Sequence, residues 1–192
     1  MIERSTRRTL ALSLALAAAL AGSAQAQVIG DQPWTTVGAA GTVSSVDTTD
    51  VAYFTGGWVG LAAGATSATI RYNVTAVDGL LATDGPMPTR TLLRVKFLDP
   101  GETAHVNVTL KDFDLEDSFG FGTTLMTLDS DDYAPSGTFQ TRDIWCDAVD
   151  FDFDFVHKGY FLEVRLSRPA GGSNPALGMV QLGRTTQGCI VD

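Results

Sequence analysis

Acidic side chains are concentrated in one part of this sequence, and they are its strongest candidates for chemistry. Between Asp112 and Asp154 there are twelve acidic residues against a single base, Arg142. Crowded carboxylates repel one another unless a cation lies among them, and Ca²⁺ binds about six to eight oxygen ligands. The polar segment 129–141 is predicted to be a long loop, whose oxygens can surround an ion. The candidate calcium ligands are the acids of this loop, Asp129, Asp131 and Asp132.

A solvated acidic surface is the alternative interpretation of the same residues. Asp150, Asp152 and Asp154 have the spacing that begins an EF-hand loop. Such a loop also needs a glycine at position 155 and a glutamate at position 161, where this sequence has phenylalanine. These three acids therefore fit the solvent-facing side of a strand better than a calcium loop, and calcium binding elsewhere stays open.

Aromatic side chains are a second group of candidates, because a flat ring can stack on a sugar ring. The candidate ligand-stacking residues are Tyr133, Trp58 and Trp145. Tyr133 lies in the polar segment beside the acids and is expected to be the most exposed of the three. The alternative is burial, since tryptophan in a β-sandwich usually belongs to the core.

Catalytic motifs are missing from the sequence. It contains no Gly-x-Ser-x-Gly elbow, no His-Glu-x-x-His zinc helix and no glycine-rich phosphate loop. His105 and His157 occupy polar positions and are expected to be exposed side chains. A glycosidase needs only two carboxylates at the right separation, so a secreted glycan-active hydrolase stays an alternative. The sequence favours a protein without catalytic activity.

The elements that must position these side chains are β-strands, because several segments alternate apolar and polar residues and none after the leader has helical spacing. In the segment 68–77, Ile70 and Tyr72 are predicted to face the core, while Thr69 and Arg71 face solvent. Further strands are predicted at 34–37, 51–54, 58–61, 123–128 and 176–182.

Two β-hairpins are predicted from alternation and turn residues. The first joins segment 91–98 to segment 103–111 through Asp99-Pro100-Gly101-Glu102. The second lies within Cys146–Arg168 and turns at Lys158-Gly159. Its predicted cross-strand pairs are Phe155 with Leu162, Phe153 with Val164 and Phe151 with Leu166 on the buried face, and Asp154 with Glu163 and Asp152 with Arg165 on the solvent face. Recurrent short strands with turns between them predict an all-β fold, a single antiparallel β-sandwich of jelly-roll type with about eight to ten strands.

The first residues predict export from a bacterial cell. Basic residues precede an apolar run at 10–20, which ends in the small-x-small pattern of a signal peptidase site at Ala24-Gln25-Ala26. Residues 1–26 are therefore a predicted signal peptide and residues 27–192 the domain, located in the periplasm, at the cell surface or outside the cell. We expect no membrane insertion after cleavage, because no other apolar segment is long enough to anchor the chain.

The cysteines predict a disulfide bond, and the net charge excludes one class of partner. Cys146 and Cys189 are an even count in an exported chain, which predicts a disulfide bond. The formal net charge of −9 argues against nucleic acid as a partner. The leading hypothesis is a non-catalytic β-sandwich with a cell-surface, matrix or adhesive role. The alternative is a carbohydrate-binding module, with or without calcium. Polysaccharide and further copies of the chain are the candidate partners.

Overall fold

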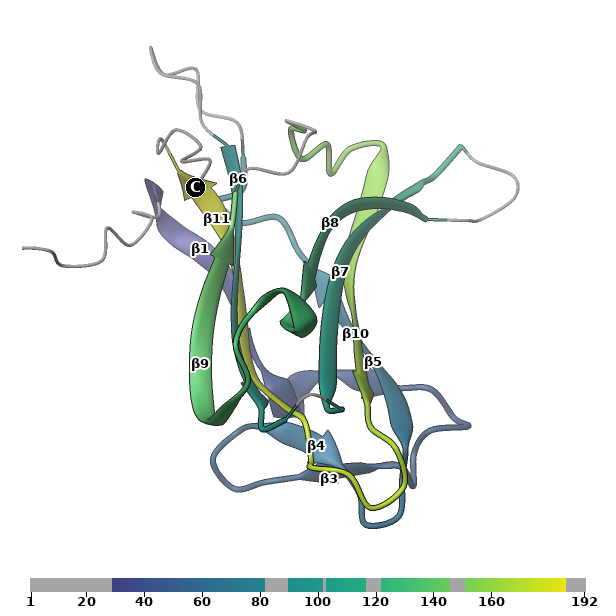
Figure 1. Cartoon of the computed structure of the whole chain (residues 1–192). Helices are drawn as coiled ribbons and strands as arrows, with labels where there is room; N and C mark the ends of the chain where they lie inside the picture. Colours follow the sequence, from purple (N-terminus) through teal and green to yellow (C-terminus); the bar gives the residue numbers. More distant parts are fainter. Residues whose placement is uncertain (1–28, 82–89, 102, 117–121, 146–150, 186–192) are drawn as a thin grey trace, which may run out of the picture.

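Two antiparallel β-sheets pack face to face in this protein (Figure 1). The computed structural model describes residues 29–81, 90–101, 103–116, 122–145 and 151–185. Its strands are β1 (Ile29–Val37), β2 (Thr42–Val43), β3 (Val51–Tyr53), β4 (Val59–Leu61), β5 (Ser67–Val74), β6 (Arg90–Asp99), β7 (His105–Asp114), β8 (Thr123–Asp129), β9 (Ser136–Ile144), β10 (Lys158–Ser167) and β11 (Ala176–Thr185). Two short 3-10 helices accompany them, η1 (Gly38–Ala40) and η2 (Ser130–Asp132).

The strand order is that of a jelly roll. The first sheet has the order β3-β4-β11-β6-β9, with β1 also paired to β11, and the second has the order β2-β5-β10-β7-β8. Three of the strands have only two or three residues. When the other eight are numbered along the chain, the sheets read 1-8-3-6 and 2-7-4-5, which is the jelly-roll arrangement. The predicted all-β sandwich is confirmed.

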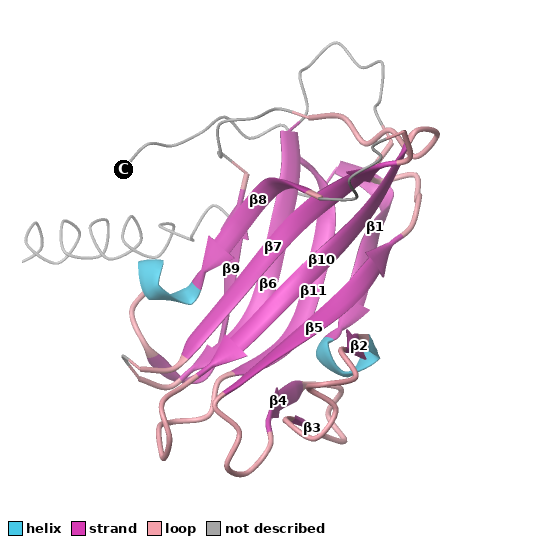
Figure 2. Ribbon diagram, turned by 90° about the vertical axis from the view of Figure 1, so that its right-hand side faces the viewer, coloured by secondary structure: helices cyan, strands magenta, loops and turns pink. Residues whose placement is uncertain are grey.

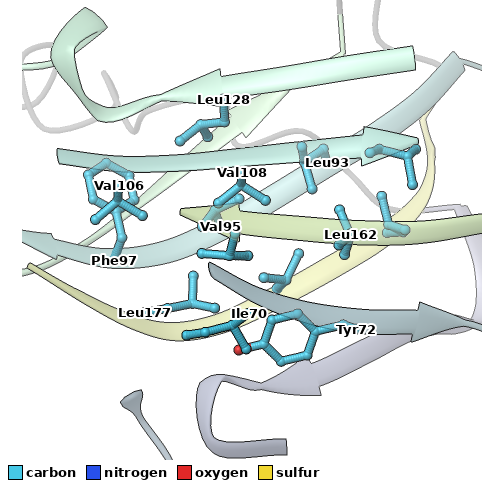
Figure 3. Packing of buried hydrophobic residues seen from close by; sticks show 14 of the residues in the cluster. Ile70, Tyr72, Leu93, Val95, Phe97, Val106, Val108, Leu128, Leu162 and Leu177 are labelled. Atoms are coloured by element: carbon cyan, nitrogen blue, oxygen red, sulfur yellow. The ribbon is translucent and has the colours of Figure 1, made fainter. Parts of the chain in front are cut away.

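The core lies between the sheets and is filled by alternate residues of the long strands (Figure 3). In β5, Ile70 and Tyr72 are buried, while Arg71 between them is exposed. The hydroxyl of Tyr72 donates a hydrogen bond of 2.5 Å to the carbonyl of Gly38, so this buried polar group is satisfied. The predicted strand at 68–77 is confirmed as β5, which ends at Val74, three residues earlier than predicted.

No helix among the described residues is long and apolar enough to cross a membrane. The predicted signal peptide, residues 1–26, lies outside the described part of the chain, as do Cys146 and Cys189.

The first predicted hairpin is wrong in its pairing, although both of its strands exist. β6 belongs to the first sheet and β7 to the second, so the turn after Asp99 carries the chain across the core. Val95 in β6 and Val108 in β7 are both fully buried. An apolar face turned inward is equally compatible with two strands in one sheet and with two strands facing each other from opposite sheets. The alternation predicted the faces correctly and could not predict the partners.

The second predicted hairpin is also wrong, because its first arm is not a strand. Strand β10 begins at Lys158, and Phe155–His157 form a turn. β10 pairs with β5 on one side and with β7 on the other, so neither edge is free for residues 151–155. The predicted burial is nevertheless found in part, since Phe153 is buried while Asp152 and Asp154 are exposed.

The phenylalanines of this segment cover one end of the core. The rings of Phe153 and Phe155 lie 4.8 and 5.0 Å from the ring of Tyr160 in edge-to-face geometry. The backbone N–H of Asp154 donates to the Tyr160 hydroxyl at 2.8 Å, and the Asp154 carboxylate accepts from the N–H groups of Val156 and His157. The alternating Phe and Asp residues therefore fold over the core as an aromatic cap closed by a turn.

The predicted long loop at 129–141 is wrong as well. This segment contains η2 and most of β9, and β9 pairs with β6 at the edge of the first sheet. The polar composition of this segment reflects a strand at the edge of the sheet, where many side chains remain in water.

Candidate ligand-binding site

An open hollow of about 450 Å³ lies on the outer face of the second sheet, where β5 and β10 pair and the segment after β2 approaches them. Figure 2 shows this sheet from its outer side, with β2 beside β5. The hollow is lined by Ser44, Asp47, Ser67, Ala68, Thr69, Arg71, Glu163 and Arg165.

The two strands position the charged side chains by their register. Arg71 of β5 is directly opposite Glu163 of β10, and Thr69 is opposite Arg165. Because successive side chains of a strand point to opposite faces, the intervening residues Ile70 and Val164 fill the core. The polar groups of the hollow are therefore fixed to a packed sheet.

The wall of the hollow beside β5 is a turn that is bonded to the sheet. The N–H of Asp47 donates to the carbonyl of Ser44 at 2.9 Å, and the N–H of Asp50 donates to the carbonyl of Asp47 at 2.9 Å. One carboxylate oxygen of Asp47 accepts from the backbone N–H of Thr69 at 3.2 Å. This bond holds the turn, and the Asp47 carboxylate with it, against β5.

Glu163 is the centre of an ion-pair network. Its Oε2 accepts from Nε and Nη2 of Arg71 at 3.0 and 2.8 Å, and its Oε1 accepts from Nζ of Lys111 at 2.7 Å. The hydrogen bond from Lys111, with that from Arg71, lowers the pKa of Glu163 against the opposing effect of partial burial. The carboxylate is therefore ionised, and its charge is balanced by the two cations.

Arg165 differs from these charged neighbours. Its side chain is exposed, and within the described part of the chain it makes neither an ion pair nor a hydrogen bond. Its guanidinium presents a planar fork of N–H donors toward the solvent side of the sheet. This residue is the cation of the hollow that is free to bind a ligand.

The predicted calcium ligands lie away from the hollow, around η2. Asp129 caps this helix, with Oδ1 accepting from the N–H of Asp131 at 3.1 Å and Oδ2 from the amide of Asn107 at 3.0 Å. Asp131 pairs with Nδ1 of His105 at 2.5 Å, and Asp132 is exposed. Among the described residues, no group of three or more His, Cys, Asp or Glu side chains is placed to hold a metal ion. These contacts account for Asp129 and Asp131 without a cation, and calcium binding stays a prediction.

The three predicted stacking residues lie beside three different elements, Trp58 just before β4, Tyr133 just after η2 and Trp145 just after β9, and none of them is in the lining of the hollow. Trp58 is stacked on Phe54 at 3.4 Å with its ring 8° from parallel, so one flat face is covered. Tyr133 is half-buried beside Phe97 rather than fully exposed, and Arg142 lies 5.2 Å from the centre of its ring. Trp145 is half-buried, and its buried Nε1 has no hydrogen-bond partner among the described residues.

The residues of the hollow were not predicted as a site. The alternation does place Arg71, Glu163 and Arg165 on solvent-facing positions, but it pairs Glu163 with Asp154 and Arg165 with Asp152. In the structure these partners are replaced by Arg71 and Thr69 of β5. The sequence did show charged residues at the outward positions of the two strands. That these strands are neighbours could be learned only from the tertiary fold.

Comparison with known proteins gives only distant structural similarity. The sequence matches no protein-family model and no curated protein. The chain is similar to a family two carbohydrate esterase from Cellvibrio japonicus, with a TM-score of 0.39 and 10% identity over 83% of this chain and 36% of that chain. It is also similar to the structure of PfGH50B, with a TM-score of 0.37 and 13% identity over 81% of this chain and 23% of that chain. This chain therefore spans well under half the length of either protein, and neither similarity bears on what it binds.

Proposed function

We propose that this protein is an exported, non-catalytic β-sandwich that binds polysaccharide through the hollow between β5 and β10. The observation that carries the proposal is the hollow itself, an open concave surface whose donors and acceptors are fixed on a packed sheet. Sugars present many hydroxyl groups, each of which donates and accepts hydrogen bonds. Carboxylates, guanidinium groups and the hydroxyls of Ser67 and Thr69 match such a ligand, and an open hollow admits part of a long chain.

The state of the carboxylates favours binding over hydrolysis. Glycoside hydrolysis needs a carboxylic acid with a raised pKa that can protonate the leaving oxygen. Glu163 has a lowered pKa, because Lys111 and Arg71 both donate hydrogen bonds to it. The Asp47 carboxylate is engaged by a backbone N–H. Both groups are suited to accept hydrogen bonds from hydroxyls.

The location of the protein follows from the leader. A signal peptide at residues 1–26 would deliver the domain to the periplasm, the cell surface or the exterior, where polysaccharides are abundant. Binding to such a polymer is the means by which the β-sandwich would perform the adhesive or matrix role that the sequence favours.

The experiment compares two bulky substitutions on the same face of β5. Ser67→Trp fills the hollow, whereas Asn73→Trp places the same side chain about 20 Å along the strand at an exposed position that does not line it. Binding to a panel of soluble polysaccharides is measured by affinity electrophoresis and calorimetry. We expect saturable binding by the wild type and by Asn73→Trp, and loss of at least tenfold in affinity for Ser67→Trp. Equal binding by the two variants would remove the hollow as the site. Absence of binding across neutral and acidic polymers would remove the proposed function.

A further inference from the structure

The charge of the hollow differs from that of the rest of the chain. The protein has a formal net charge of −9, yet two of its 13 basic residues, Arg71 and Arg165, line this one surface. The Glu163 carboxylate beside them is bound by Arg71 and by Lys111. What the hollow offers to a ligand is therefore the guanidinium of Arg165, which makes no ion pair with the described residues, and the Asp47 carboxylate on the same lining.

We infer that the sugar bound in this hollow is a uronic acid, whose carboxylate is held by Arg165. This inference rests on the proposed function and names its ligand class. A planar guanidinium binds a carboxylate through two parallel N–H···O bonds, and this pairing is stronger and more directional than a hydrogen bond between neutral groups.

The other groups of the hollow distinguish a uronic acid from other anions. Asp47 repels a densely charged polymer, but it accepts hydrogen bonds from sugar hydroxyls. The hydroxyls of Ser44 and Ser67 are further neutral partners on the lining. A polymer with one carboxylate and several hydroxyls on each residue satisfies both Arg165 and Asp47. A nucleic acid or a highly sulfated glycan has too much negative charge for a protein of this net charge.

The test compares one polysaccharide in a charged and an uncharged form. Polygalacturonate and its fully methyl-esterified form have the same sugars and the same linkages, and differ in the free carboxylates. Calorimetry with the wild-type protein is expected to show at least tenfold tighter binding to the free acid. The affinity is also expected to fall as salt is raised, because an exposed ion pair is screened.

Variants of Arg165 assign the effect to this side chain. Arg165→Ala should lose about tenfold in affinity for polygalacturonate and should weaken binding to the methyl ester by much less, because an ester accepts hydrogen bonds but cannot form the ion pair. Arg165→Lys keeps the charge but not the fork of donors, so an intermediate loss is expected. Arg142→Ala is the matched control, since Arg142 is another exposed arginine on a strand and does not line the hollow. It should bind like the wild type.

The outcomes separate this inference from the function on which it rests. Equal binding of the acid and the ester would overturn the uronate assignment and leave polysaccharide binding intact. Binding of dextran sulfate as tight as that of polygalacturonate, with no effect of Arg165→Ala, would also overturn it, because the attraction would then be unspecific. Absence of binding to every polymer would overturn the proposed function itself.

Discussion

At the scale of single residues, the site depends on how Glu163 is held. Its carboxylate bonds to Arg71 across the β5 and β10 pair and to Lys111 on β7, so one side chain links three neighbouring strands. These bonds orient Arg71 and neutralise the acid that would otherwise repel an anionic ligand. Arg165 is then left as the free cation of the hollow.

The network predicts that stability depends on pH through Glu163. Its pKa in the folded state is lowered from the ordinary value of 4.5, mainly by the hydrogen bond from Lys111. The stabilisation is therefore complete above that ordinary value and is lost as the pH falls through the lower folded-state pKa. Glu163→Gln should cost roughly 1 kcal/mol at pH 7, because the pair is partly exposed. Urea unfolding at pH 7 and pH 3 measures this, with a smaller difference between the two proteins expected at pH 3. An equal difference at both pH values would contradict the ionised network.

At the scale of elements, strand β10 shows which features could be predicted from the sequence and which could not. Its alternation correctly predicts Leu162 and Val164 as core residues. It gives no information on the partner strands, because an inward face fits any neighbour in either sheet. The aromatic residues that precede it were assigned to a strand, but β10 already has a neighbour at each edge. Burial could thus be predicted locally, whereas pairing depends on contacts between distant segments.

Gly159 provides a direct test of whether this part of the chain is a strand, as in the structure, or a hairpin turn, as predicted. In the predicted hairpin it is a turn residue, where a β-carbon is costly if φ is positive. In the structure it lies in β10 opposite Phe113, without positive φ and with no atom within 4 Å of an added β-carbon. Gly159→Ala should therefore raise the free energy of unfolding by about 0.5 kcal/mol, since alanine restricts the unfolded chain.

The matched control for this substitution is Gly171, which has φ of +75° and equally open space around it. Gly171→Ala should lower the stability by about 1 kcal/mol, because an L side chain disfavours that backbone conformation. Thermal and urea unfolding of both variants give the comparison. A loss of stability in Gly159→Ala as large as that in Gly171→Ala would support the hairpin turn.

At the scale of the whole molecule, the jelly roll creates a site that no single segment contains. Arg71 and Glu163 are separated by 92 residues in the sequence and become direct neighbours in the second sheet. The same order brings the ends of β9 and β11 to one end of the first sheet. Ile144 pairs with Leu93 and Thr185 pairs with Arg90, so both strands end beside the first four residues of β6.

The disulfide between Cys146 and Cys189 stays a prediction, because both cysteines lie outside the described residues. The two cysteines follow Ile144 and Thr185 by two and four residues. Strands on either side of β6 are about 10 Å apart, and Ile144 and Thr185 lie opposite residues three positions apart in β6, which is about another 10 Å along the strand. The ends of the two strands are therefore about 14 Å apart, and the six residues that follow them in total can extend about 20 Å. The bond would close a loop of about 43 residues and stabilise the protein by about 4 kcal/mol.

The prediction is checked with two single variants and the double variant. If the cysteines are bonded, Cys146→Ser and Cys189→Ser should each lower the unfolding free energy by a few kcal/mol, and the double variant should lose no more than either one, because each single change already breaks the bond. The wild type should resist alkylation until a reductant is added, and the reductant should lower its urea midpoint while leaving that of the double variant unchanged. Additive losses, together with two thiols that react without reductant, would show that the cysteines are independent.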